Sequence, residues 1–146
     1  MRYKTVIRDG IAAIVVHRGK VLLLKRFPVP LIANPGIWSF VFGGRRKGEG
    51  YLDAAYREIR EETGIDRNDL TQVGHGTPVW IFDRWRRCRW QNHLFIFRSN
   101  TGRVRKNFEN TACRWAALGE IRGNTDYTNV FIDEDAILRK IARCTG

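Results

Sequence analysis

Acidic residues are scarce in this chain, and long apolar runs are absent. The 146 residues include 15 Asp+Glu against 26 Lys+Arg, which gives a formal net charge of +11. The longest apolar run, IAAIVV at Ile11–Val16, is far shorter than the roughly 20 residues that a membrane-spanning helix needs. The N-terminal stretch MRYKTVIRDG carries charges where a signal peptide has its apolar segment. We therefore expect a soluble cytoplasmic protein that has no membrane partner.

Cysteine is also scarce. Cys88, Cys113 and Cys144 are odd in number and widely spaced, and no two of them have CxxC spacing. This pattern argues against a zinc knuckle or a redox pair. We expect three free thiols in a reducing compartment.

The length of the chain indicates how many domains it forms, and its positive charge indicates which partners it favours. A chain of 146 residues with 43% hydrophobic content is enough for one domain with a sizeable core, so we expect residues 1–146 to form a single domain. A net charge of +11 favours polyanionic partners such as nucleotides or RNA. The alternative is a solvated positive surface that binds no polyanion.

Strand patterns dominate the chain, and two helical patterns are interposed. The expected strands are a pair within residues 10–27 around a turn at Arg18–Lys20, a short strand at Trp38–Phe42, a hairpin of residues 76–84 with 90–99, and a late strand at Cys113–Leu118. The expected helices are Tyr51–Thr63, which Gly64 would end, and Asp133–Cys144, with Asp133 as its N-cap. This order predicts an α/β sandwich around a mixed sheet.

The first helix carries a cluster of glutamates. Gly43–Ile65, GGRRKGEGYLDAAYREIREETGI, holds four of the seven glutamates of the chain. At about 100° per residue, Glu58 and Glu62 lie one turn apart on the same side, and Glu61 lies beside them. Like charges at this spacing destabilise a helix by a few tenths of a kcal/mol, which a bound Mg²⁺ would offset. The alternative is a solvated face that pairs with Arg57 and Arg60.

The full spacing of this segment matches a known signature. Gly43 is followed after five residues by Glu49, after seven more by Arg57-Glu58-Ile59, and then by Glu61-Glu62 and Gly64-Ile65. This resembles the Nudix box, the signature of the Nudix hydrolase superfamily, at every fixed position. Weaker resemblance extends through VLLLKR and GIWSF before the box and RWAALGEI after it.

The resemblance implies a fold, a cofactor and a set of site residues. Nudix proteins are α/β/α sandwiches in which the box forms a loop, a helix and a loop, and they use Mg²⁺ or Mn²⁺ to hydrolyse nucleoside diphosphates linked to another moiety. By this resemblance, metal ligands would be Glu58, Glu61, Glu62 and the backbone carbonyl of Gly43. Arg57 would orient a neighbouring carboxylate through an ion pair, and Glu49 would support the loop or contribute to metal binding.

The residue types suit this chemistry. Metal ions neutralise the charge that develops on a pyrophosphate and lower the pKa of bound water, and a carboxylate can accept the proton of that water. No covalent nucleophile is needed, and no Ser/His/Asp arrangement is evident.

Four residues outside the metal ligands are further candidates. Glu109 matches the place where Nudix proteins often supply another acidic residue as metal ligand or general base; the alternative is an ordinary solvated glutamate. Lys25 and Arg26 are candidate phosphate contacts. Phe42 stands where many family members have proline, which bears on the shape of the loop or on the adjacent substrate pocket.

Three functions follow from these patterns. The leading interpretation is a metal-dependent pyrophosphohydrolase that acts on a free nucleotide or nucleotide derivative, such as a nucleoside triphosphate. One alternative is hydrolysis at the 5′ end of RNA, for which the basic and aromatic segment Arg84–Trp90 would bind phosphates and bases. The segment can equally be read as a solvated hairpin tip whose tryptophans partly cover the core. Another is a non-catalytic Nudix domain that binds a nucleotide or nucleic acid, against which the intact box argues.

Overall fold

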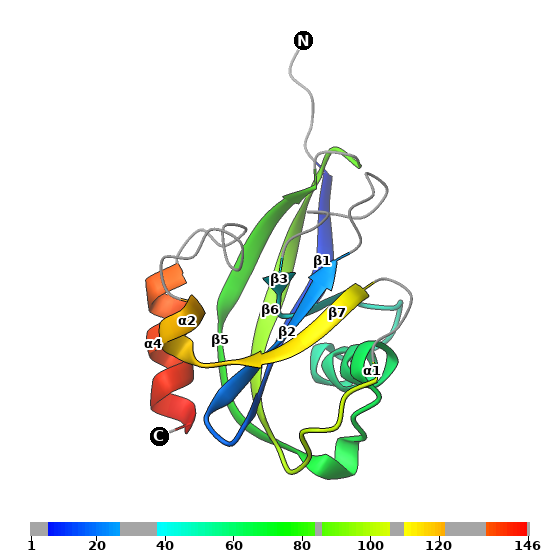
Figure 1. The fold of residues 1–146 in the computed structure, drawn as a ribbon. Coiled ribbons are helices and arrows are strands. Elements are labelled where there is room, and N and C mark those ends of the chain that lie inside the picture. Colours follow the sequence, from blue (N-terminus) through cyan, green and yellow to red (C-terminus); the bar gives the residue numbers. More distant parts are fainter. Residues whose placement is uncertain (1–5, 27–37, 84–85, 106–109, 122–133, 146) are drawn as a thin grey trace.

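The computed structural model describes residues 6–26, 38–83, 86–105, 110–121 and 134–145 (Figure 1). Within these ranges the strands are β1 Val6–His17, β2 Lys20–Arg26, β3 Trp38–Ser39, β4 Val41–Gly44, β5 Leu70–Asp83, β6 Cys88–Ser99 and β7 Asn110–Ala116. The helices are α1 Tyr51–Thr63, the 3₁₀ turn η1 Arg67–Asp69, α2 Leu118–Ile121 and α4 Glu134–Thr145. The described strands form one mixed sheet in the order β3-β2-β1-β6-β5, while β4 pairs with β1 and β7 pairs with β2.

Strand β1 lies in the middle of the sheet because its apolar run is buried on both faces. It runs parallel to β6 and antiparallel to β2 and β4. Ala12, Ile14 and Val16 belong to one core cluster, and the alternating residues Ile11, Ala13 and Val15 belong to the other. A continuous apolar run in the sequence is therefore the pattern of a strand covered from two sides.

Helix α1 covers one face and α4 the other (Figure 1). Ala54, Ala55 and Ile59 of α1 are fully buried, and Gly64 ends the helix in the left-handed conformation at φ 76°. The predicted helix Tyr51–Thr63 is confirmed at both bounds. This is the α/β fold that the sequence predicts.

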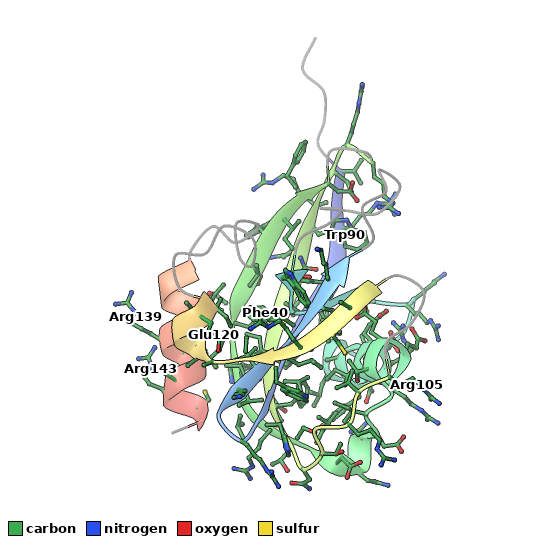
Figure 2. All side chains as sticks on the ribbon, viewed as in Figure 1. Phe40, Trp90, Arg105, Glu120, Arg139 and Arg143 are labelled. Atoms are coloured by element: carbon green, nitrogen blue, oxygen red, sulfur yellow. The ribbon has the colours of Figure 1, made fainter. Side chains whose placement is uncertain are left out.

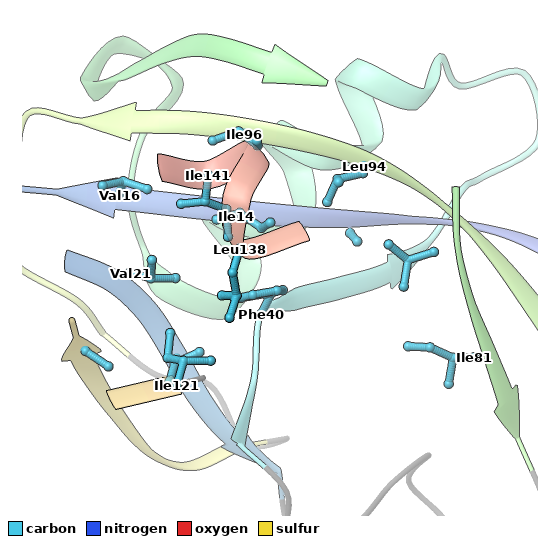
Figure 3. Packing of buried hydrophobic residues seen from close by; sticks show 14 residues of the cluster. Ile14, Val16, Val21, Phe40, Ile81, Leu94, Ile96, Ile121, Leu138 and Ile141 are labelled. Atoms are coloured by element: carbon cyan, nitrogen blue, oxygen red, sulfur yellow. The ribbon is translucent and has the colours of Figure 1, made fainter. Parts of the chain in front are cut away.

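The core on the opposite face is built around α4. Figure 3 shows Leu138 and Ile141 of this helix close to Ile14 and Phe40, and all four residues are at most 2% exposed. The helix runs from Glu134 to Thr145, one residue later at each end than expected. The predicted N-cap Asp133 lies outside the described residues. None of the helices in the described ranges is long and apolar enough to cross a membrane.

Three strand predictions need correction. The expected strand Trp38–Phe42 is split, because β3 pairs with β2 while β4 pairs with β1, and Phe40 between them is buried in the core. The expected late strand lies earlier, at Asn110–Ala116, and Leu118 begins α2.

The hairpin is longer than predicted, since β5 starts at Leu70. Its register shifts between Gly76 and Val79, next to Pro78, which has no amide hydrogen to donate to a neighbouring strand. Apolar alternation is interrupted there, and for that reason the sequence pattern marks only the second half of the strand.

Candidate functional site

Helix α1 meets strand β4 along one seam, where Glu58 lies against Gly43. The antiparallel pairing of β4 with β1 places Gly43 opposite Ile11 and Gly44 opposite Gly10. A Cβ atom at Gly43 would overlap the carboxyl group of Glu58. The missing side chain of Gly43 is therefore what allows the Glu58 carboxylate to lie directly against the backbone of β4.

The three candidate ligands differ strongly in exposure. Glu62 is 2% exposed as a residue, the Glu58 side chain is 15% exposed, and the Glu61 side chain is 45% exposed. This gradient follows from the helix geometry, because Glu62 is adjacent to the buried Thr63 and one turn from Glu58. Burying a carboxylate carries a large desolvation penalty unless charges or donors compensate it.

Arg57 joins four parts of the box through one guanidinium. Its Nε and Nη2 donate to the two carboxylate oxygens of Glu49 at 2.8 and 2.9 Å, and Nη2 also donates to the carbonyl of Gly44 at 2.8 Å. Its Nη1 donates to Glu58 at 2.7 Å and to Glu61 at 3.3 Å. Planar paired hydrogen bonds of this kind fix orientation as well as charge.

The ion pair between Arg57 and Glu49 shifts the pKa of both groups. The hydrogen bonds from Arg57 lower the pKa of Glu49 from 4.5 to about 2. Those same bonds, with the contact to Glu58, raise the pKa of Arg57. The box loop is thereby tied to the helix by a group that stays charged at neutral pH.

The donor set suits a hard cation, although it is not arranged as a preformed centre. Within the described part of the chain, no three histidine, cysteine, aspartate or glutamate side chains form a group that could hold a metal ion. Glu58 and Glu61 contact Arg57 instead. Carboxylate and carbonyl oxygens are nevertheless the ligands that Mg²⁺ prefers, and Gly43 leaves room for Glu58 beside its own carbonyl.

Asp9 also anchors the box, and sequence reasoning missed it. One oxygen of its carboxylate accepts hydrogen bonds from the Tyr51 hydroxyl at 3.0 Å and from Arg45 Nη2 at 3.4 Å. Its backbone carbonyl accepts from the Arg45 amide at 3.2 Å. Burial and the bond to Asp9 raise the pKa of Tyr51. No local signal marks Asp9, because its partners are more than thirty residues away in the sequence.

Of the other predicted site residues, Lys25 and Phe42 have side chains that the structure describes. The Lys25 Nζ lies 6.0 Å from the centre of the Trp38 ring, and Phe42 is partly buried against the core on the α4 side. The backbone of Arg26 pairs with Asn110, and nothing further is described of its side chain. Glu109 lies outside the described residues.

Within the basic segment Arg84–Trp90, the described side chains lie on both faces of the sheet. Arg84 and Trp85 lie outside the described residues, and Arg86 is paired with the buried carboxylate of Asp83 at 2.8 Å. Arg89 and Trp90 are neighbours in β6, so their side chains point to opposite faces. The Arg89 guanidinium lies 4.8 Å from the centre of the Trp80 ring, and Trp90 packs against the core on the α4 side (Figure 2).

Comparison with known proteins relates this chain to one family. A family model described as NUDIX domain matches residues 7–137. An RNA pyrophosphohydrolase of Pelagibacter ubique is 38% identical over 71 residues, which cover 48% of this chain and 42% of the relative. Nudix hydrolase 2 of Arabidopsis thaliana is 37% identical over 59 residues, which cover 40% of this chain and 21% of the relative. The chain thus spans less than half the length of these two relatives.

Solved structures show the shared fold. The MutT protein from Methanosarcina mazei Go1 has a TM-score of 0.76 at 20% identity, with 97% of each chain covered. An Ap4A hydrolase of C. elegans has a TM-score of 0.75 at 20% identity, with 93% of this chain and 96% of that chain covered. Because the family model matches well over half of the sequence, the chain belongs to the NUDIX domain family, which confirms the family and the fold that the box predicts.

Proposed function

We propose that this chain is a metal-dependent pyrophosphohydrolase that cleaves a nucleoside diphosphate linked to another moiety, with residues 1–146 acting as one domain in the cytoplasm. The observation that carries the proposal is the seam between β4 and α1. There a buried and a half-buried carboxylate, Glu62 and Glu58, lie on one side of a helix, with Glu58 against the backbone of Gly43.

In this proposal Glu58, Glu61, Glu62 and the carbonyl of Gly43 hold Mg²⁺ or Mn²⁺. The bound ion would neutralise charge on the pyrophosphate and lower the pKa of a water molecule. Arg57 has a second task, because it contacts Glu58 and Glu61 as well as Glu49. It holds those two carboxylates close together through its Nη1.

The remaining roles belong to residues around this seam. Glu49 holds Arg57 in place through two hydrogen bonds and so supports the loop. Glu109 stays a candidate for the general base. Lys25 and Arg26 are proposed to contact phosphate, and Phe42 to border the substrate.

The preferred substrate is a free nucleotide or derivative, and RNA is the second candidate. Several relatives that match this chain at about 40% identity over part of their length are named RNA pyrophosphohydrolase. The net charge of +11 also suits a polyanion. A non-catalytic domain is disfavoured, because every glutamate of the box is present.

A test of the metal site uses one isosteric change. Glu62→Gln keeps the shape of the side chain and removes its charge, so we expect turnover to fall by orders of magnitude while the fold is retained. Glu120→Gln is the matched control, because Glu120 is 48% exposed and pairs only at the surface with Arg114. Hydrolysis of a nucleotide panel would be measured with Mg²⁺, with Mn²⁺ and with a chelator, which should abolish it. Near-normal turnover in Glu62→Gln would refute the site.

A second experiment separates the two substrates. Binding of a short 5′-triphosphate RNA should weaken with salt by a log–log slope of about −0.7 for each phosphate contacted, whereas a nucleoside triphosphate should show a shallower slope. Replacing the exposed Arg87 and Arg89 should flatten the slope for RNA and spare hydrolysis of the nucleotide. Equal shallow slopes for both ligands would remove the RNA candidate.

A further inference from the structure

One amide interrupts an apolar row on the α4 side of β6. Alternate residues of a strand share a face, and here they are Trp90, Asn92, Leu94 and Ile96. Asn92 is 3% exposed, as buried as Leu94. Burying an amide costs free energy unless its donor and acceptor are hydrogen-bonded, whereas an apolar side chain carries no such cost. An asparagine at this position therefore calls for an explanation beyond packing in the apolar row.

The amide lies beside the candidate metal site because a glycine makes room for it. Gly10 of β1 is the direct neighbour of Asn92 across the sheet. A Cβ atom at Gly10 would lie 2.5 Å from Asn92 Oδ1 and 2.7 Å from the carbonyl oxygen of Gly43. These two oxygens consequently lie within about 5 Å of each other. The Gly43 carbonyl is the group that the proposed function assigns to the metal.

A fixed aromatic ring borders the same point. Trp90 Cε3 would lie 3.2 Å from a Cβ at Gly10, and its outer ring carbons would lie 3.5 and 3.6 Å from one at Gly44. The indole Nε1 donates to the buried carboxylate of Asp83 at 3.4 Å, and the Arg8 guanidinium lies 6.0 Å from the ring centre. Figure 2 shows Trp90 in the upper part of the sheet, above Phe40. Its position is thus held from several directions, as a stacking surface requires.

We propose that Asn92 hydrogen-bonds the nucleobase of the substrate, with the Trp90 ring as the wall against which that base packs; this rests on the proposed function. A side-chain amide offers a donor and an acceptor next to each other, as the edge of a nucleobase does. A phosphate offers only acceptors. Because the amide lies beside the carbonyl that would bind the metal, it faces the nucleoside half of a substrate whose pyrophosphate is at the metal.

The test compares Asn92→Leu with Gln91→Leu. Leucine has the same branched shape as asparagine, although it is larger, and it suits the apolar row, so Asn92→Leu should keep the melting temperature, whereas loss of a structural asparagine would lower it. Gln91 is the neighbouring amide on the opposite face of β6, and its replacement should change nothing. We expect KM for the preferred nucleoside triphosphate to rise about tenfold in Asn92→Leu, with kcat retained.

Base discrimination is the decisive measurement. Across the four nucleoside triphosphates, the KM differences of the natural protein should collapse in Asn92→Leu, and KM for inorganic tripolyphosphate, which has no base, should stay the same. Asn92→Asp replaces the donor by an acceptor and should also alter the order of preference, which keeps the test available if the leucine variant does not fold. An unchanged order of preference in a folded Asn92 variant would overturn the proposal.

Binding separates this proposal from the proposed function. Dissociation constants of the four nucleoside monophosphates, measured by calorimetry with chelator present, need no hydrolysis. If no nucleotide is hydrolysed but base-dependent binding is lost in Asn92→Leu, the proposed function fails and the role of Asn92 stands. If the monophosphates bind equally well to the natural protein and to Asn92→Leu, the role of Asn92 is refuted whatever the activity.

Discussion

Replacing Glu49 by glutamine should destabilise the protein at neutral pH and have little effect in acid. The substitution preserves shape and removes the charge that Arg57 Nε and Nη2 bind at 2.8 and 2.9 Å. A carboxyl pKa lowered from 4.5 to about 2 corresponds to at most about 3 kcal/mol of folding free energy at pH 7. Both side chains are 17% exposed, and Arg57 keeps other acceptors, so we expect a loss of about 1–2 kcal/mol.

The pH dependence has a definite sign. The pKa of Glu49 is lower in the folded protein than in the unfolded chain, so the unfolded chain takes up the proton first as pH falls. The stabilisation is therefore complete above about pH 4.5 and is lost as pH falls towards about 2. The free energies of unfolding of the natural protein and of Glu49→Gln should differ at neutral pH and become equal as pH falls through this window.

Urea unfolding followed by tryptophan fluorescence would measure the difference at several pH values. Glu120→Gln is the control, because its ion pair with Arg114 has side chains that are 48% and 41% exposed and should contribute less than about 1 kcal/mol. If the difference in unfolding free energy between the natural protein and Glu49→Gln stays constant from neutral to acidic pH, the ion pair with Arg57 is not the cause of that difference. Equal unfolding free energies of the natural protein and Glu49→Gln at neutral pH would refute the expected loss of stability.

Three other outcomes are expected. Gly43→Ala should abolish hydrolysis, because the new methyl group overlaps the carboxyl of Glu58; an active, folded variant would contradict the seam geometry. Tyr51→Phe should remove the component of an absorbance titration that ionises above the usual tyrosine range, since burial and Asp9 raise the pKa of that hydroxyl; an unaltered titration curve would disprove this. Ile141→Ala should lower the free energy of unfolding by about 2–4 kcal/mol in a denaturant titration, because Ile141 is the fully buried contact of α4 with the core, and a loss below about 1 kcal/mol would show that α4 packs loosely.

Local patterns predicted the parts of the site that lie within one element. The bounds of α1 follow from its apolar spacing and from Gly64, whose left-handed conformation ends the helix. The same spacing places Glu58 and Glu62 on one side of that helix, as their restricted exposure shows. The family follows from the box, since its glycines and glutamates recur at fixed intervals within one loop and one helix.

The split of Trp38–Phe42 between two partners was not predictable in the same way. The residues are all apolar or small, which is typical of any buried strand. Only the packing of Phe40 into the core, with β3 on β2 and β4 on β1, decides where the pairing changes. The choice depends on which neighbours are available in the sheet.

The sequence by itself determined the family, the helix that carries the glutamates and the pair of strands around the turn at Arg18–Lys20, because each depends on spacing along the chain. The tertiary structure alone decided what surrounds the site. Asp9 reaches Tyr51 and Arg45, and Asn92 lies over Gly10 beside the carbonyl of Gly43, through the register of β1 with β4 and β6. A register shift of one residue would turn these side chains to the other face, so their roles are properties of the assembled sheet.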